Sequence, residues 1–143
     1  MIRLGTARDA LRNLEIWRRA VAATHDFLSP GDLARIDALV ADWLPGAEPW
    51  VYVDQTDGPL GFTALTGAHV DALFVDPARH GAGVGRALMA HARRLHGRLT
   101  VDVNEQNSRA VGFYERLGFE RTGRSPTDGQ GMPYPLLHMT WPA

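Results

Sequence analysis

The sequence predicts an α/β domain of the α+β kind, with a mixed, mostly antiparallel sheet and the element order β-α-α-β-β-β-α-β-α-β-β. Three observations lead to this prediction. Apolar residues recur at helical spacing in the first third of the chain, the pattern changes to alternation over residues 50–75, and a glycine-rich turn then introduces helices that alternate with strands. The chain has 143 residues, 45% of them hydrophobic, so we expect a single domain over residues 1–143 with one core.

Two amphipathic helices are expected after a short apolar start at residues 1–4. The first covers about residues 8–24. The second begins after Ser29, because a serine N-cap followed by proline at N1 and an acid at N3 is a typical helix start, and it ends at Pro45-Gly46. The apolar stripes expected to face the core are Leu11, Leu14, Trp17 and Val21 in the first helix and Leu33, Ile36, Val40 and Trp43 in the second.

Alternation then predicts an antiparallel group of three strands. Turn signals at Asp57-Gly58 and Thr66-Gly67 separate these strands. After the glycines, a helix ends near His96, and a right-handed crossover leads to the next strand. The expected strands lie near 50–54, 60–66, 68–75, 99–103, 119–124 and 136–141, with a further helix at about 108–117.

The composition excludes several classes of protein. The net charge of −1 predicts neither a nucleic-acid nor a membrane partner. No apolar run approaches the roughly 20 residues of a membrane span, and "MIRLGTARDA" lacks the apolar segment of a signal peptide. Without cysteine there is no disulfide, thiolate zinc site or cysteine nucleophile, and histidines 91, 96 and 138 lack metal-ligand spacing. We therefore expect a cytoplasmic protein without a metal.

The segment "DPARHGAGVGRAL", residues 76–88, has glycines at positions 81, 83 and 85. Each glycine costs roughly 0.5–1 kcal/mol against alanine in regular structure, so the pattern indicates that something approaches this backbone closely. A flexible turn needs only one glycine. A dinucleotide-binding fingerprint is the second interpretation, and Glu105 lies at a fitting distance for it. That fingerprint, however, is spaced G-x-G-x-x-G and follows the first strand of a parallel sheet, unlike this segment. A pyrophosphate cradle at a helix N-terminus, with Arg86 and Arg79 at its rim, fits best.

Two stretches resemble motifs of the GNAT N-acetyltransferases. "VDPARHGAGVGRALM" is similar to their acetyl-CoA-binding signature, Arg/Gln-x-x-Gly-x-Gly/Ala, and "NSRAVGFYERLGF", residues 107–119, resembles Asn-x-x-Ala-x-x-Phe-Tyr-x-x-x-Gly-Phe. The element order also resembles the fold of this family, so the resemblance covers nearly the whole chain. The stretches "ATHDFL", "NEQN", "AVGFY" and "PYPLL" further resemble its bacterial YjaB-type branch of peptidyl-lysine acetyltransferases.

The resemblance implies a GNAT fold and direct acetyl transfer, in a ternary complex, from acetyl-CoA as cosubstrate to a primary amine of a protein lysine or a small molecule. One departure is His80, which stands where the signature has arginine or glutamine, with an arginine displaced to position 79. Asn107 resembles the family's coenzyme-contacting asparagine, and the alternative is a simple helix N-cap. The implied cofactor-binding residues are Phe74, Val75, His80, Gly81, Ala82, Gly83, Val84, Gly85, Arg86, Asn107 and Tyr114.

Acetyl transfer to an amine needs a neutral amine, a polarised thioester carbonyl and a proton for the leaving thiolate. The resemblance assigns a backbone N–H of Leu73 or Phe74 to the thioester oxygen. His69, six residues before Val75, takes the position of a general base, and histidine side chains ordinarily titrate near neutral pH. A half-exposed strand histidine without a role is an equally weighted alternative. Asp71, on the same strand face, is the reserve base or a contact for the substrate ammonium.

Tyr114 is the expected general acid. The resemblance places its hydroxyl near the coenzyme sulfur, where it would protonate the departing thiolate. Its position on the apolar stripe Ala110, Phe113, Tyr114 and Leu117 also allows a packed core tyrosine.

Candidate acceptor-site residues are His25 and Asp26, which follow the first helix, together with Glu105 and the loop at 125–135. A histidine at a helix end can instead meet only the last carbonyls. Two functions fit the sequence: an N-acetyltransferase, favoured by Tyr114 and His69, and a non-catalytic acyl-CoA-binding sensor with the same fold. Homodimers are common in the family, and the sequence shows no clear interface.

Overall fold

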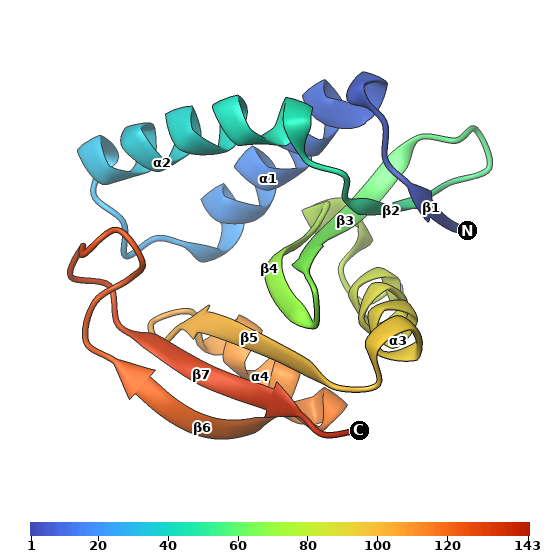
Figure 1. Ribbon diagram of the computed structural model, residues 1–143. Helices are drawn as coiled ribbons and strands as arrows, with labels where there is room; N and C mark the ends of the chain where they lie inside the picture. Colours follow the sequence, from blue (N-terminus) through green and yellow to red (C-terminus); the bar gives the residue numbers. More distant parts are fainter. The chain divides into compact units, whose positions relative to one another are not determined.

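The computed structural model describes residues 1–143, and its helices and strands occur in the predicted order (Figure 1). No helix is both long enough and apolar enough to cross a membrane. The strands are β1 (Ile2–Leu4), β2 (Trp50–Val53), β3 (Pro59–Thr66), β4 (His69–Val75), β5 (Leu99–Asn104), β6 (Glu120–Ser125) and β7 (Leu136–Trp141). The helices are α1 (Ala10–Thr24), α2 (Pro30–Trp43), α3 (Val84–His96) and α4 (Ser108–Leu117), with short 3-10 helices η1 (Ala7–Asp9), η2 (Leu44–Gly46) and η3 (Pro77–Arg79).

The seven strands follow the hydrogen-bonding order β1-β2-β3-β4-β5-β7-β6. β4 and β5 are parallel, whereas β1 with β2, β2 with β3, β5 with β7 and β6 with β7 are antiparallel. This is the mixed, mostly antiparallel sheet that the sequence predicts. The chain divides into two compact units: the first contains Met1–Ala64 and Ala72–Met89, and the second contains Leu65–Asp71 and Ala90–Ala143.

In the first unit, α1 and α2 pack on β2 and β3. The helix α2 begins as predicted, because the Ser29 Oγ accepts a hydrogen bond from the Asp32 N–H at 3.1 Å and Pro30 occupies the first helical position. Leu33, Ile36 and Val40 of α2 pack, half-buried, against the core. The buried core residues are Ile16, Trp17 and Val21 of α1, Leu44 of η2, Val51 and Val53 of β2, and Phe62 of β3.

Two residues of the predicted apolar stripes lie outside this core. Leu11 is 82% exposed, because α1 buries the face that carries Ile16 and Trp17, and a residue five positions before Ile16 points to another side of the helix. Trp43 is 41% exposed, because α2 ends there and the chain turns into η2. The next residue, Leu44, takes the buried place instead.

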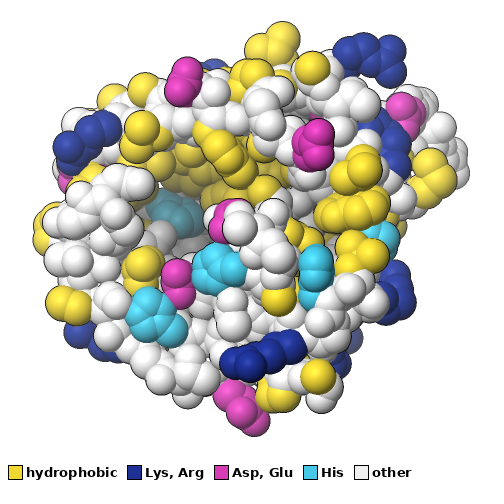
Figure 2. All heavy atoms as spheres, in the orientation of Figure 1, with side chains coloured by type: hydrophobic (Ala, Val, Ile, Leu, Met, Phe, Trp, Pro, Cys, Tyr) yellow, Lys and Arg dark blue, Asp and Glu magenta, His cyan; other side chains and the backbone are white.

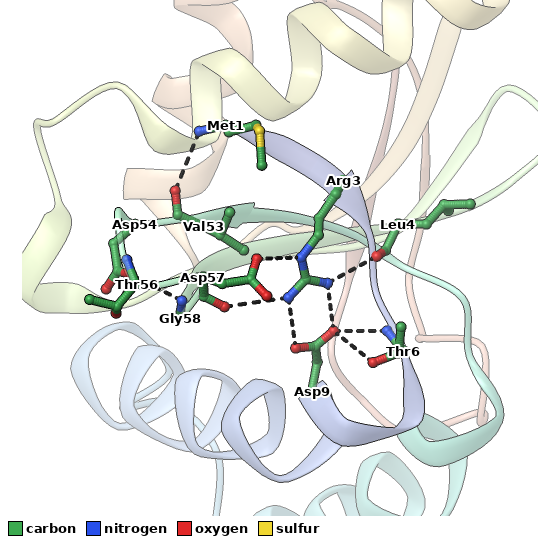
Figure 3. Close-up of polar contacts among 10 residues, drawn as sticks. All are labelled: Met1, Arg3, Leu4, Thr6, Asp9, Val53, Asp54, Thr56, Asp57 and Gly58. Carbon is green, nitrogen blue, oxygen red and sulfur yellow. Dashed lines mark hydrogen bonds and ion pairs between the residues drawn. The ribbon is translucent and has the colours of Figure 1, made fainter.

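Arg3 connects β1 to two turns of the first unit (Figure 3). Its guanidinium donates to both carboxylate oxygens of Asp9, at 2.9 and 3.1 Å, and its Nε donates to Asp57 at 2.7 Å. Asp9 is buried and also accepts the Thr6 N–H at 2.8 Å. The hydrogen bonds from Arg3 are the main reason that the pKa of Asp9 lies below its ordinary value. Charge and hydrogen bonding therefore attach the N-terminal strand to η1 and to the β2–β3 turn.

In the second unit, α4 lies behind the strands β5, β7 and β6 (Figure 1). Residues on β5 alternate: Leu99, Val101 and Val103 are buried, whereas Asp102 between them is exposed. β5 and β7 pair in register, so Asp102 stands opposite His138. The result is a sheet with one apolar face and one polar face. The buried apolar residues of this unit include Val111 and Tyr114 of α4, Phe119, and Leu137 and Met139 of β7.

Candidate active site

The glycine-rich loop between η3 and α3 belongs to the first unit. Gly81 and Gly83 have φ angles of +82° and +84°, in the left-handed region that favours glycine. The Gly83 carbonyl accepts the first hydrogen bond of α3, from the Ala87 N–H at 3.0 Å. A Cβ built on Gly81 or Gly83 would meet no protein atom within 4 Å. The two glycines therefore shape an uncrowded backbone directly before a helix N-terminus. Gly85, by contrast, lies inside the first turn of α3.

The backbone N–H groups of this loop are not equivalent. Those of His80 and Ala82 donate to the carbonyl oxygens three residues before them, at 3.2 and 3.1 Å, and are used inside the loop. Those of residues 84–86 come before the first α-helical hydrogen bond of α3, where the positive end of the helix dipole lies. The Arg86 side chain is exposed and the Val84 side chain is buried. The N–H groups in the first turn of α3 can therefore donate to a bound anion, whereas those of His80 and Ala82 are already used.

Asp76 anchors the chain just before the loop. Its buried carboxylate accepts hydrogen bonds from Arg12 Nη2 at 2.7 Å, Arg19 Nη1 at 3.0 Å and the Ala78 N–H at 3.0 Å. Its own N–H donates to the Leu60 carbonyl at 2.8 Å. Burial alone would raise the pKa of Asp76, but the hydrogen bonds from Arg12 and Ala78 and the two arginine charges outweigh it and lower the pKa. Two arginines of α1 thus fix the start of η3.

Gly61 allows close packing beneath the same loop. A Cβ at this position would lie 2.8 Å from Val84 Cγ1 and 3.1 Å from the Phe74 carbonyl oxygen. Only a residue without a side chain lets β3 approach β4 and the start of α3 this closely.

The residues expected to contact the thioester lie at the end of β4. The Phe74 ring packs against Trp17 and Phe62, with centroid distances of 6.4 and 5.9 Å, so its side chain belongs to the core and only its backbone can serve a ligand. Leu73 and Val75 are half-buried. The backbone roles expected of these three residues stay predictions.

His25 lies at the end of α1, with the exposed Asp26 after it. Its N–H donates to the Val21 carbonyl at 2.8 Å, and its Nδ1 lies 2.8 Å from Thr24 Oγ1. Burial lowers the pKa of His25, and the nearby Asp26 acts in the opposite direction. The contact with a helix carbonyl is therefore made by the backbone N–H of His25, whereas its ring meets the Thr24 hydroxyl. A substrate contact of His25 stays a prediction.

A row of polar side chains crosses the second unit. His69 Nδ1 lies 2.7 Å from Thr100 Oγ1, and His69 Nε2 lies 3.6 Å from Asp102 Oδ2. The other carboxylate oxygen, Asp102 Oδ1, lies 2.6 Å from His138 Nδ1, and His138 Nε2 lies 2.6 Å from Ser125 Oγ. We name these five residues the histidine–aspartate row. Histidine and acidic side chains also reach the surface on the face seen in Figure 2.

Two other expected acidic residues of the second unit already have partners. Asp71 is exposed and accepts a hydrogen bond from the Thr66 hydroxyl. Glu105 accepts hydrogen bonds from Nε and Nη2 of Arg124, and these are the main reason that the pKa of Glu105 lies below its ordinary value. Their roles as reserve base and specificity element stay predictions.

Tyr114 on α4 is only 6% exposed. Its ring centroid lies 5.2 Å from that of Phe113 and 5.1 Å from that of Phe119, both in edge-on geometry. Burial raises the pKa of Tyr114, so its hydroxyl is protonated at neutral pH. A general acid must be protonated, and a packed core tyrosine would be buried in the same way, so the catalytic role stays a prediction.

Asn107 is the N-cap of α4. Its Oδ1 accepts the Ala110 N–H at 3.1 Å, and its N–H donates to the Asn104 carbonyl at 2.9 Å. The alternative role of Asn107 as a helix N-cap is therefore confirmed, and its contact with the coenzyme stays a prediction.

The sequence did not reveal Asp76, Gly61, Asp102 or His138 as residues of interest. Alternation along β5 puts Asp102 on the polar face, but only the register of β5 and β7 pairs it with His138. The Asp-Pro pair at 76–77 is a helix-start signal that could have drawn attention to Asp76.

A model of the acetyltransferase (GNAT) domain matches residues 45–121. The chain belongs to the GNAT acetyltransferases. It is 50% identical to peptidyl-lysine N-acetyltransferase YjaB of Salmonella typhimurium, over 99% of this chain and 97% of the relative. It is 52% identical to YjaB of Escherichia coli, over 88% and 86% of the two chains. The solution structure of apo YjaB from Escherichia coli superimposes with a TM-score of 0.95 at 47% identity and covers 100% of this chain and 98% of that one. These findings confirm the predicted GNAT fold and acetyltransferase activity, and GNAT acetyltransferases use acetyl-CoA.

Proposed function

We propose that this GNAT acetyltransferase transfers the acetyl group of acetyl-CoA directly to the ε-amino group of a protein lysine, within a ternary complex. The relatives that support a lysine acceptor carry the name peptidyl-lysine N-acetyltransferase, and one of them matches 99% of this chain at 50% identity. The alternative acceptor is a small amine, and an acetylation assay that compares a lysine peptide with small amines decides between the two.

The loop before α3 carries the proposal for acetyl-CoA. The uncrowded backbone at Gly81 and Gly83 and the N–H groups of residues 84–86 suit the phosphates of a coenzyme, because backbone donors and the helix dipole both favour an anion there. Arg86 would add a positive charge at the rim. When bound, acetyl-CoA supplies the acetyl group as a thioester.

The chain's own residues would move the protons. His69 Nε2 would accept a proton from the substrate ammonium and leave a neutral amine, and the Tyr114 hydroxyl would donate a proton to the departing sulfur. A backbone N–H at Leu73 or Phe74 would hold the thioester oxygen. No covalent intermediate on the enzyme is needed, in keeping with a chain that has no cysteine.

The two ends of α3 provide a matched test of the loop. Gly83 and Gly97 flank the helix, have φ angles of +84° and +76°, and would each carry a Cβ with no atom within 4 Å. Alanine at either position should cost a similar roughly 1–2 kcal/mol of stability through left-handed strain. Only Gly83→Ala should weaken acetyl-CoA binding, by about tenfold or more, because its methyl group would enter the space proposed for phosphate.

Binding is measured by calorimetry and by thermal unfolding with and without ligand. Acetyl-CoA at 100 times its dissociation constant should stabilise the wild type by about 2.7 kcal/mol, and Gly97→Ala should retain this gain. Equal binding by Gly83→Ala and Gly97→Ala would refute the cradle. Protection by NADH but not by acetyl-CoA would favour the dinucleotide alternative.

A further inference from the structure

We infer that Asp102 and His138 are positioning residues for the proton transfer assigned to His69, with Asp102 placed between the two histidine rings. This inference rests on the proposed function, because it takes His69 as the proton acceptor. It adds two residues, on β5 and β7, to a site so far described around His69 on β4.

Thr100 orients the His69 ring. Its Oγ1 lies 2.7 Å from Nδ1, so an Nδ1–H can donate to this oxygen. In the neutral ring, a hydrogen on Nδ1 leaves the lone pair on Nε2. In this tautomer the nitrogen that accepts the proton is the one that faces Asp102.

Asp102 offers one carboxylate oxygen to each histidine. Oδ2 lies 3.6 Å from His69 Nε2, which is too far for a hydrogen bond but close enough to stabilise the positive charge that His69 gains with the proton. Oδ1 lies 2.6 Å from His138 Nδ1. A carboxylate only accepts hydrogen bonds, so His138 Nδ1 carries a hydrogen and holds the carboxylate in place.

Ser125 completes the support from β6. Its Oγ lies 2.6 Å from His138 Nε2, where neutral His138 accepts a hydrogen bond and protonated His138 donates one. Both states of His138 therefore keep its ring in position. In either state the Nδ1–H of His138 holds the Asp102 carboxylate beside His69.

Two other charged side chains near the histidine–aspartate row, Asp71 and Arg124, have partners of their own. Asp71 lies on the same face of β4 as His69 and is bonded to Thr66. Arg124, next to Ser125 on β6, is paired with Glu105. Asp102 is the carboxylate within 4 Å of both histidine rings.

The proton balance of the reaction requires a group that accepts a proton from the substrate and releases it to water. A lysine ammonium loses one proton to His69, its nitrogen then bonds to the acetyl carbon as the carbon–sulfur bond breaks, the nitrogen loses its second proton, and the sulfur takes one up. Each turnover therefore releases one net proton. A neighbouring carboxylate favours uptake of that proton by His69, and the exposure of about a third of the His69 side chain lets the proton leave to water.

The test compares Asp102→Asn and Asp102→Glu with Asp57→Asn in the full chain. Asp57 is an exposed carboxylate of the β2–β3 turn that pairs with Arg3, so it controls for loss of a surface ion pair. The acidic limb of kcat/KM for a lysine peptide, followed from about pH 5.5 to 9, should move to lower pH in Asp102→Asn, because the variant lacks the negative charge that stabilises a protonated His69. The plateau should fall about twofold, because a weaker base accepts the proton less well. Asp102→Glu should restore most of the position of the acidic limb and most of the plateau value of kcat/KM.

Histidine ring NMR signals provide a readout that needs no turnover. The ring signals of His69 and His138 should both move in Asp102→Asn, because each ring faces one oxygen of this carboxylate, whereas neither should move in Asp57→Asn. Unchanged ring signals of either His69 or His138 in Asp102→Asn would overturn the inference. A wild type that binds acetyl-CoA but acetylates no lysine peptide would instead overturn the proposed function, and the NMR comparison would still decide whether Asp102 positions both rings.

Discussion

Replacement of Asp76 by asparagine should destabilise the protein by more than an ordinary surface ion pair would. The carboxylate is buried beneath two arginines of α1 and caps η3, directly before the glycine loop. Asparagine keeps the size of the side chain and can still accept the Ala78 N–H, but it removes the negative charge. The substitution therefore isolates the charge from the cap.

The structure sets the expected magnitude. Two hydrogen bonds between a carboxylate and a guanidinium would contribute roughly 1.5–3 kcal/mol each if fully buried. The Arg12 and Arg19 side chains are 29% and 46% exposed and regain water when the charge is lost. Discounted by about half for this hydration, the loss is about 1.5–3 kcal/mol, or about 5–9 °C in Tm for a chain of this size.

Urea unfolding followed by circular dichroism measures the effect, with Asp37→Asn as the control. Asp37 also accepts two hydrogen bonds from one arginine, Arg18, at 2.8 and 2.9 Å, but this pair lies at the surface, so Asp37→Asn should lose much less stability. Because the pKa of Asp76 is lowered by folding, its stabilisation is present above the unfolded value of about 3.9 and disappears as pH falls through the folded pKa. The difference between wild type and Asp76→Asn should therefore shrink as the pH falls below about 4. An equal loss in Asp76→Asn and Asp37→Asn at neutral pH, or a pH-independent difference, would refute the anchoring role.

Three further predictions concern the site. Tyr114→Phe should lower kcat roughly 10²-fold with little change in Tm and acetyl-CoA binding, and full activity would return Tyr114 to a core role. His69→Ala should lower the rate and alter the acidic limb of kcat/KM while coenzyme affinity is unchanged, and an unaltered pH profile would point to another base. Gly61→Ala should cost about 1–3 kcal/mol and weaken acetyl-CoA binding, because its Cβ would press on Val84 and the Phe74 carbonyl, whereas Gly31→Ala on the open face of α2 should do neither. Equal behaviour of the two alanine variants in unfolding and calorimetry would contradict the close packing beneath the loop.

Local signals in the sequence were sufficient for most of the elements. The start of α2 depends on four consecutive residues from Ser29, and the structure has the predicted cap there. Alternation and turn signals marked the three strands β2, β3 and β4. β2 buries alternate residues, Val51 and Val53, whereas β3 buries residues 61–64 in a row. The glycines at 81 and 83 indicated an unusual backbone, and their positive φ angles confirm it.

Contacts between distant residues could not be predicted in the same way. Asp76 meets Arg12, which lies 64 positions earlier, and Asp102 meets His138, which lies 36 positions later. The first pair depends on how α1 packs beside η3, and the second on the register of β5 with β7. Apolar spacing also misplaced Leu11 and Trp43, because it does not fix which side of a helix faces the core or where the chain leaves the helix.

The central claim is that acetyl-CoA delivers its acetyl group to a protein lysine through His69 and Tyr114. Its most direct test incubates the full chain with acetyl-CoA and a lysine peptide, with a matched peptide in which arginine replaces lysine, and follows peptide mass together with release of free thiol. We predict acetylation of the lysine ε-amino group with one thiol released per acetyl group, no change in the arginine peptide, and strongly reduced rates in His69→Ala and Tyr114→Phe. Binding of acetyl-CoA without acetylation of any amine would identify a non-catalytic sensor, and acetylation of small amines alone would contradict the lysine acceptor.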